Sequence, residues 1–174
     1  IAESIYIGLI TDTGSFKYSS VSSSTHLIAS KLKEIGLNHV AIHNNIFDQN
    51  SVSKINLLGY ALQKIKLDQK SSLAYLVLSQ EELEQFNFQK GDSEGFVNYC
   101  LSIKGVKNAV FLREDKSLIK ISLRSIGDVK MNEFSKRYYS GGGHQNAAGA
   151  VVESNDIGTV TKTLIENFRS FCSV

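Results

Sequence analysis

A glycine-rich segment in the C-terminal part of the chain carries residue types that can bind a phosphate. Three consecutive glycines, Gly141, Gly142 and Gly143, precede His144. Because glycine has no Cβ, the backbone amides of this stretch can approach an anion directly. His144 can add a hydrogen bond or a partial charge. A helix starting near His144 would also point its unpaired N–H groups at the anion. The segment therefore predicts a site for a phosphate backbone or a nucleotide.

The same segment also has a purely structural interpretation. Gly141 can cap the preceding helix, and the residues that follow can form a flexible turn. A single glycine would favour this interpretation. Three glycines, a histidine and the small residues Ala147-Ala148-Gly149 favour a binding loop instead.

Arg124 and Ser125 form a second pair of candidate phosphate ligands. They end a predicted strand whose polar face carries Lys120 and Ser122. Arginine can hold a phosphate through two parallel hydrogen bonds, and the serine hydroxyl can add another. Taken alone, Arg124 is more simply explained as a solvated side chain at a strand end. It becomes a candidate ligand in combination with the glycine segment.

Asp12 is a candidate metal ligand in the turn Thr11-Asp12-Thr13-Gly14, which follows an apolar run. In α/β enzymes, metal-binding carboxylates lie at the end of such a core element, and Thr11 and Thr13 could orient this one. One aspartate is not a metal site, because hard divalent ions need several oxygen or nitrogen ligands. From spacing alone, an Asp-Gly turn or a helix cap is the simpler interpretation.

The elements that must position these residues are predicted from periodicity and turn residues. The apolar run 5–10 is too short to assign to a helix or a strand. A helix is expected from near Thr25 to Gly36, and residues 39–66 are mostly helical. Four strands are predicted at 73–78, 109–113, 118–123 and 150–152, and the alternating run 118–123 places Ile119, Ile121 and Leu123 on one face. Between and after them, a capping box of Ser79 and Glu82 opens a short helix, and further helices are predicted at 96–103, 131–139 and 156–168. This alternation of strands and helices predicts an α/β domain from about residue 70 onward.

Composition narrows the class of protein. The 174 residues are 42% hydrophobic and 21% charged, as in globular proteins, and can bury a sizeable core. A net charge of +2 does not by itself indicate nucleic acid, so a basic patch would have to be local. Two cysteines without metal-like spacing fit a reducing cytoplasm. No apolar run is long enough for a membrane span, so no membrane association is expected.

Three segments, taken in order, resemble the C-terminal part of the DHH phosphoesterase family, specifically its bacterial group of nanoRNases and phosphoadenosine-phosphate phosphatases, relatives of RecJ. Gly8–Tyr18 resembles the family's fourth metal motif, and Ser122–Ser125 resembles its substrate-contacting strand. Gly141–Gly149 resembles the signature of its DHH-associated C-terminal domain. The resemblance covers essentially the whole chain. It implies a C-terminal domain with a mixed β-sheet flanked by helices, after a helical connector and the tail end of an α/β catalytic domain.

The resemblance also implies roles for single residues. Asp12 would be a ligand to one of two catalytic manganese ions. The phosphate or base of a short RNA or DNA oligonucleotide, or of a nucleotide phosphate, would be held by Arg124, Ser125, Gly141, Gly142, Gly143 and His144. The implied domains are residues 1–36 as the remnant of the DHH catalytic domain, 37–70 as the connector, and 71–174 as the DHH-associated substrate-binding domain.

The family's first three motifs, including its Asp-His-His triplet, are absent from this sequence. Asp12 alone cannot assemble a dinuclear centre, so we expect a fragment of a manganese-dependent phosphoesterase that hydrolyses nothing by itself. Two alternatives are a non-catalytic nucleic-acid binding domain like that attached to alanyl-tRNA synthetases, and part of a cyclic-dinucleotide phosphodiesterase. The sequence leaves the oligomeric state open, and a homodimer is compatible with it.

Overall fold

The structure is a computed structural model that describes residues 1–18 and 20–173. These residues form two compact units, the first of residues 1–50 and the second beginning at Ser51. We describe each unit by itself. Within the described residues, no helix is both long enough and apolar enough to cross a membrane.

The first unit consists of three helices, α1 (Ala2–Asp12), α2 (Ser23–Glu34) and α3 (His39–Phe47). The apolar run that sequence left unassigned is therefore helical and lies in α1. Ser22 begins α2 with a reciprocal capping box to Thr25, which satisfies amides that lack a partner in the first turn. The unit has a small core, whose buried members are Tyr6, Ile10, Leu32, Leu37 and Ile42.

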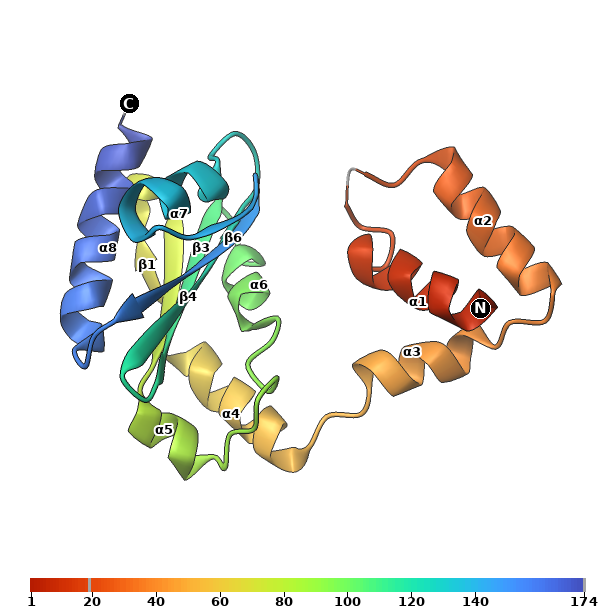
Figure 1. Ribbon diagram of the computed structural model, residues 1–174, viewed down its shortest axis with the longest axis horizontal. Helices are drawn as coiled ribbons and strands as arrows, with labels where there is room; N and C mark the ends of the chain where they lie inside the picture. The colour runs from red at the N-terminus through yellow and green to blue at the C-terminus, as the bar shows by residue number, and fades with distance from the viewer. Residues whose placement is uncertain (19, 174) are drawn as a thin grey trace. The chain divides into compact units, whose positions relative to one another are not determined.

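The second unit is a six-stranded mixed sheet flanked by helices, as the α/β prediction requires (Figure 1). The strand order is β1-β2-β3-β4-β6-β5, and only the β2–β3 pair is parallel. In chain order the elements are α4 (Val52–Gln63), β1 (Lys66–Asp68), a 3-10 turn (Gln69–Ser71), β2 (Leu73–Leu78), α5 (Gln80–Gln85), α6 (Phe96–Leu101), β3 (Asn108–Asp115), β4 (Leu118–Ser125), α7 (Met131–Tyr139), β5 (Gly142–His144), β6 (Ala147–Glu153) and α8 (Ile157–Cys172).

The two faces of the sheet are covered differently. One face packs against α7 and α8, and its core includes side chains from β2, β3, β4 and β6. The other face packs against α4 and α6 (Figure 1), and its buried strand residues come only from β2 and β3. On this second face, the half of the sheet formed by β4, β6 and β5 therefore contributes no buried side chain to the core.

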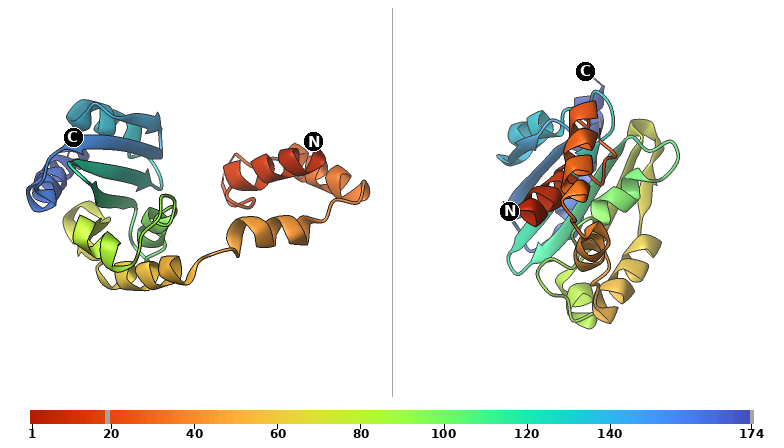
Figure 2. Two further views of the ribbon diagram at one scale, coloured as in Figure 1. Left: turned by 60° about the horizontal axis from the view of Figure 1, so that its bottom comes forward. Right: turned by 90° about the vertical axis from the view of Figure 1, so that its right-hand side faces the viewer.

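The stretch 39–66 is mostly helical, as predicted, and consists of α3 and α4 with a break between them. The boundary between the compact units falls between these helices, at Asn50 and Ser51. Leu57 and Ala61 of α4 are fully buried in the core of the second unit. Strand β1, which periodicity did not indicate, follows α4 directly and pairs with β2. Both views in Figure 2 show the first unit as helices only and the sheet within the second.

Candidate nucleic-acid interface

The glycine-rich segment forms an edge strand and does not lead into a helix. Gly142–His144 is β5, which pairs with β6 through the tight turn Gln145-Asn146. No helix starts near His144, so the contribution that the N-terminus of such a helix could make to anion binding is not available here. The physical reason is that the hairpin satisfies the backbone by cross-strand pairing. As β5 stands at the end of the sheet, its outer backbone edge faces no further strand.

The three glycines meet different surroundings. A Cβ on Gly141 would lie 2.3 Å from the Gly149 carbonyl oxygen, and a Cβ on Gly143 would lie 2.5 Å from the Ala147 carbonyl oxygen. Gly143 also has a φ of +139°, which side chains rarely allow. A Cβ on Gly142 would meet no atom within 4 Å. Packing therefore requires Gly141 and Gly143 to be glycine, whereas Gly142 opens onto free space.

The strand register brings His144 and Arg124 into one row. Ala147 of β6 pairs with His144 of β5 on one side and with Arg124 of β4 on the other. Residues directly opposite each other in a sheet project to the same face. With neighbouring strands about 4.8 Å apart, the Cα atoms of His144 and Arg124 are roughly 10 Å apart across the small Ala147 side chain.

The next row has the same character, because Gly142 pairs with Gly149 and Gly149 with Ser122. This row offers a hydroxyl and two positions without a side chain. We call the two rows the open face, and its residues are Ser122, Arg124, Gly142, His144, Ala147 and Gly149. Its small residues lie between the guanidinium of Arg124 and the imidazole of His144. They leave the backbone of this face accessible to a ligand.

The Arg124 side chain is available to bind an anion. Further along the same face of the sheet, Arg113 and Lys120 both pair with Asp115, and the hydrogen bond from Lys120 lowers the pKa of that carboxyl. Arg124 makes no ion pair within the described residues. One of its five N–H donors bonds the Leu123 carbonyl oxygen at 2.9 Å, so the others remain for a ligand.

Ser125 holds the hairpin turn and is not exposed to a ligand. Its side chain is buried, its hydroxyl donates to the Val129 carbonyl oxygen at 2.7 Å, and it accepts from the Asn146 amide at 2.9 Å. Asn146 also donates to the Gly127 carbonyl oxygen at 2.9 Å. The geometry gives Ser125 a positioning role, since these bonds fix the turn that follows His144.

Helix α7 fixes the glycine segment from the other side. The Ser135 hydroxyl, fully buried, donates to the Gly149 carbonyl oxygen at 2.9 Å, and the Ser135 carbonyl accepts from the Gly141 amide at 3.1 Å. Sequence reasoning did not single out Ser135 or Asn146. A signal for Ser135 was present, because it shares the apolar stripe of its helix with Met131, Phe134 and Tyr138.

Asp12 is the last residue of α1, and its side chain is exposed. The neighbouring threonines do not orient it. Thr11 and Thr13 donate to carbonyl oxygens of their own helix, Ile7 at 2.8 Å and Leu9 at 2.6 Å. Within the described residues, neither hydroxyl is hydrogen-bonded to the Asp12 carboxylate. The following residues Gly14, Ser15 and Phe16 all have positive φ, so the chain turns sharply after Asp12.

The described residues do not form a metal site by themselves. They contain no group of three or more His, Cys, Asp or Glu side chains placed to hold an ion. One exposed carboxylate supplies one ligand, and a divalent cation needs several. Asp12 does not fit a complete metal centre within this chain, so we assign no chemical step to a metal here.

Comparison with known proteins identifies the second unit. Residues 70–170, more than half of the chain, match the family described as the DHHA1 domain. These residues include β2–β6, α7, most of α8 and the whole open face.

Individual relatives match over almost the whole chain. The probable bifunctional oligoribonuclease and PAP phosphatase NrnA of Streptococcus mutans is 31% identical over 95% of this chain and 54% of its own length. The bifunctional oligoribonuclease and PAP phosphatase NrnA of Bacillus subtilis is 28% identical over 89% of this chain and 48% of its own. An exopolyphosphatase-related protein from Bacteroides fragilis is 38% identical in a structure superposed with a TM-score of 0.91, over 99% of this chain and 52% of that one.

The chain spans about half the length of these relatives. The match to the family profile covers the sheet and helices that build the open face. The chain belongs to the DHHA1 domain family, the DHH-associated C-terminal domain of the DHH phosphoesterases.

Proposed function

We propose that the open face binds the phosphates of a short oligonucleotide or of a nucleotide. The single observation that carries this proposal is the row in which Arg124 and His144 face the same side across Ala147. A guanidinium and an imidazole on such a row can hold one phosphate between them or two consecutive phosphates. The neighbouring side chains are small, so the backbone of the ligand can lie directly on the sheet.

Each residue of the open face has a role in this proposal. Arg124 holds a phosphate oxygen pair through two N–H groups, and His144 donates a further hydrogen bond. Gly142 leaves room for the ligand to approach the edge strand. Ser125 acts through Asn146 by fixing the turn next to His144. Gly141 and Gly143 allow the tight packing of the hairpin on α7 and β6.

For the whole protein, we propose hydrolysis of short oligoribonucleotides, phosphoadenosine phosphate or both. The names of the two curated relatives support this substrate class, and the family of this chain supports phosphoester chemistry. Asp12 is proposed as one ligand of a manganese ion whose other ligands this chain does not contain. We place the protein in the cytoplasm, where its free cysteines Cys100 and Cys172 would remain reduced.

The whole-protein proposal is tested with the natural full-length protein. Hydrolysis of a ribodinucleotide and of phosphoadenosine phosphate is measured with manganese, for the parent protein and for Asp12→Ala. We expect Asp12→Ala to lose at least about 100-fold in rate, because a metal ligand is removed. Asp48→Ala, a second exposed aspartate of the first unit, is the matched control. Full activity of Asp12→Ala would refute the metal assignment.

A non-catalytic nucleic-acid binding domain is distinguished by the same experiment. In that case the full-length protein would bind the dinucleotide through Arg124 and His144 but would not hydrolyse it under any metal condition. Asp12→Ala would then change neither binding nor chemistry.

A further inference from the structure

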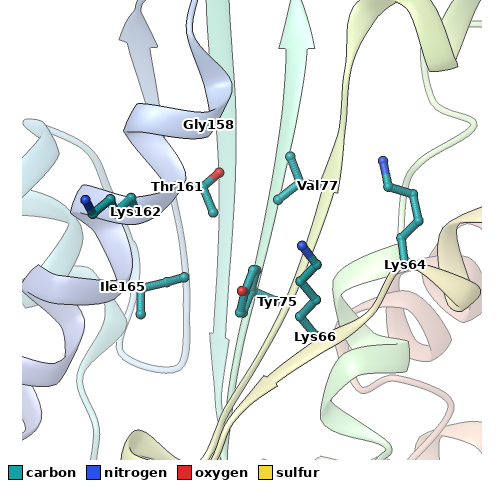
Figure 3. Close-up of a pocket in the computed structure, with 8 residues that line it drawn as sticks. All are labelled: Lys64, Lys66, Tyr75, Val77, Gly158, Thr161, Lys162 and Ile165. Atoms are coloured by element: carbon teal, nitrogen blue, oxygen red, sulfur yellow. The ribbon is translucent and has the colours of Figure 1, made fainter.

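A cavity of about 440 Å³ lies in the second unit, between α8 and the β1–β2 edge of the sheet (Figure 3). This volume is within the range that holds small ligands. Tyr75 and Val77 of β2 and Ile165 of α8 form an apolar floor. Lys64, Lys66 and Lys162 lie around it.

The cavity follows from the local sequence. On α8, the residues Gly158, Thr161, Lys162 and Ile165 are spaced i, i+3, i+4 and i+7, so they form one stripe that faces β2. Lys66 pairs directly with Tyr75 and so projects to the same face of the sheet. Gly158 lies in the first turn of α8 and has no side chain, so the part of the cavity next to that turn is unfilled.

The charges around the cavity favour an anion. Within the described residues, Lys66 and Lys162 make no ion pair and both are exposed. Lys64 pairs with Glu82, so its charge is largely compensated. The carboxylate of Asp156, which lies next to Gly158, caps α8 by accepting from the Thr159 amide at 2.9 Å and keeps its negative charge. Lys66 and Lys162 therefore bring two positive charges against this one negative charge, so the net charge at the cavity favours an anion.

The cavity is separate from the open face. Tyr75 and Val77 pack on the α7–α8 side of the sheet, whereas Arg124 pairs with Ala109, which is buried on the α4–α6 side. The two sites are also at opposite edges of the sheet. From β2 to β5 there are four strand intervals, or roughly 19 Å. A small ligand cannot contact both sites.

We infer that this cavity binds a phosphomonoester with a planar apolar body, which is the chemistry of a mononucleotide. The planar body lies on Tyr75, Val77 and Ile165, where an aromatic ring gains stacking and apolar burial. The phosphate lies at Lys66, and Lys162 reaches it by turning its side chain, whose ammonium group points away from Tyr75 in Figure 3, toward the cavity. Each lysine offers three N–H donors. This inference does not depend on the proposed function of the open face.

The test is a nuclear magnetic resonance titration of the ¹⁵N-labelled chain with adenosine 5′-monophosphate, adenosine or inorganic phosphate. Amides of Thr161, Lys162 and Ile165 report on the cavity, and those of Gly142 and His144 report on the open face. We expect the monophosphate to shift the cavity amides and to bind there more tightly than adenosine or phosphate. Both parts of the ligand would then contribute.

Variants assign the shifts to the lysines. The double variant Lys66→Ala/Lys162→Ala is expected to weaken binding at the cavity amides at least about tenfold. The control Lys31→Ala/Lys90→Ala removes two exposed charges elsewhere and should leave that affinity unchanged.

Three results would overturn the inference. The first is the absence of shifts at the cavity amides at millimolar monophosphate. The second is an equal affinity for inorganic phosphate, which would leave the apolar floor without a role. The third is unchanged binding in Lys66→Ala/Lys162→Ala. Shifts confined to Gly142 and His144 would place the nucleotide on the open face only.

Discussion

Gly141 and Gly143 lack side chains because the hairpin has no room for a Cβ, whereas Gly142 lacks one in open space. The three consecutive glycines therefore have two different roles, one in packing and one in access to the open face. The outer two allow β5 to pack on β6 and α7, and the middle one keeps the open face accessible. Single substitutions at these glycines should therefore affect either the stability of the fold or the binding of a ligand.

We predict that Gly142→Ala keeps the free energy of unfolding within about 0.5 kcal/mol of the parent, because its Cβ meets no neighbour and its φ is allowed. The same change should weaken the binding of a short oligoribonucleotide about tenfold, since the Cβ projects onto the open face. Urea unfolding and fluorescence anisotropy measure the two effects.

Gly143→Ala is the matched comparison. It should reduce the free energy of unfolding by about 2 kcal/mol or more, because a Cβ there meets the Ala147 carbonyl oxygen at a positive φ. If Gly142→Ala instead destabilises the protein as much as Gly143→Ala, the distinction between the glycines is wrong.

Ser125 and Asn146 are predicted to act as one unit. Ser125→Ala leaves the Val129 carbonyl and one of the two N–H groups of the Asn146 amide without a partner, since the other stays bonded to Gly127. It should reduce the free energy of unfolding by about 1–3 kcal/mol. Asn146→Ala should cost a similar amount, and the double variant should cost less than the sum. Unfolding in urea measures this cycle. Additive losses would contradict the coupling.

At the scale of elements, sequence indicated the parts that local patterns determine. Helix α7 has the predicted bounds 131–139, and the capping box of Ser79 and Glu82 begins α5 as expected. The strand 118–123 and its alternation were also correct, since β4 buries every second residue. Each of these rests on side chains within a few residues of one another.

Elements that depend on distant pairing were not predictable in the same way. Strands β1 and β5 have three residues each, too few for a period to be recognised. The glycines of β5 suggested a helix start because sequence does not show that β6 pairs with them. The meeting of Arg124 and His144 needs the register of β4, β6 and β5, which nothing local determines.

An ion pair links Asp68 of β1 to Arg169 of α8 in the second unit. Arg169 donates to both carboxylate oxygens, at 3.1 and 2.7 Å, and Asp68 is 8% exposed. These bonds, with help from Ser71 and against the effect of burial, lower the pKa of Asp68 from 3.8 to about 2. The pair therefore stabilises the folded state when the carboxylate is charged.

This shift predicts how stability depends on pH. The folded pKa of Asp68 lies below the unfolded one, so its contribution is complete above about pH 4 and is lost as the pH falls through about 2. Asp68→Asn should reduce the free energy of unfolding by about 2 kcal/mol at pH 7. The difference from the parent should shrink in acid. A difference that is constant from pH 7 to pH 2 would contradict this.

At the scale of the whole molecule, the two units differ in the size of their cores. Among the residues that the structure describes, the first unit buries five hydrophobic side chains, whereas two larger clusters stabilise the second unit. Helix α4 belongs to the second unit because Leu57 and Ala61 are fully buried there. A domain beginning at residue 71, as the resemblance implies, would lack these side chains.

We predict that residues 51–174 fold independently with nearly the urea midpoint of the second unit in the whole chain. Residues 71–174 should be much less stable, since Leu57 alone contributes about 2 kcal/mol of apolar burial. Circular dichroism during urea unfolding compares the two fragments. Equal stability of both would show that α4 and β1 are not part of the folding unit.

The proposed phosphate binding by the open face depends above all on Arg124. The measurement is the affinity of the whole chain for a labelled ribotrinucleotide, at several salt concentrations, for the parent, Arg124→Ala and Arg124→Lys. We predict that Arg124→Ala weakens binding by about 10- to 100-fold and flattens the salt dependence by about one phosphate contact. Arg124→Lys should recover part of the affinity, because it keeps the charge but not the paired donors. An Arg124→Ala protein that stays folded and binds the trinucleotide as tightly as the parent would contradict the account.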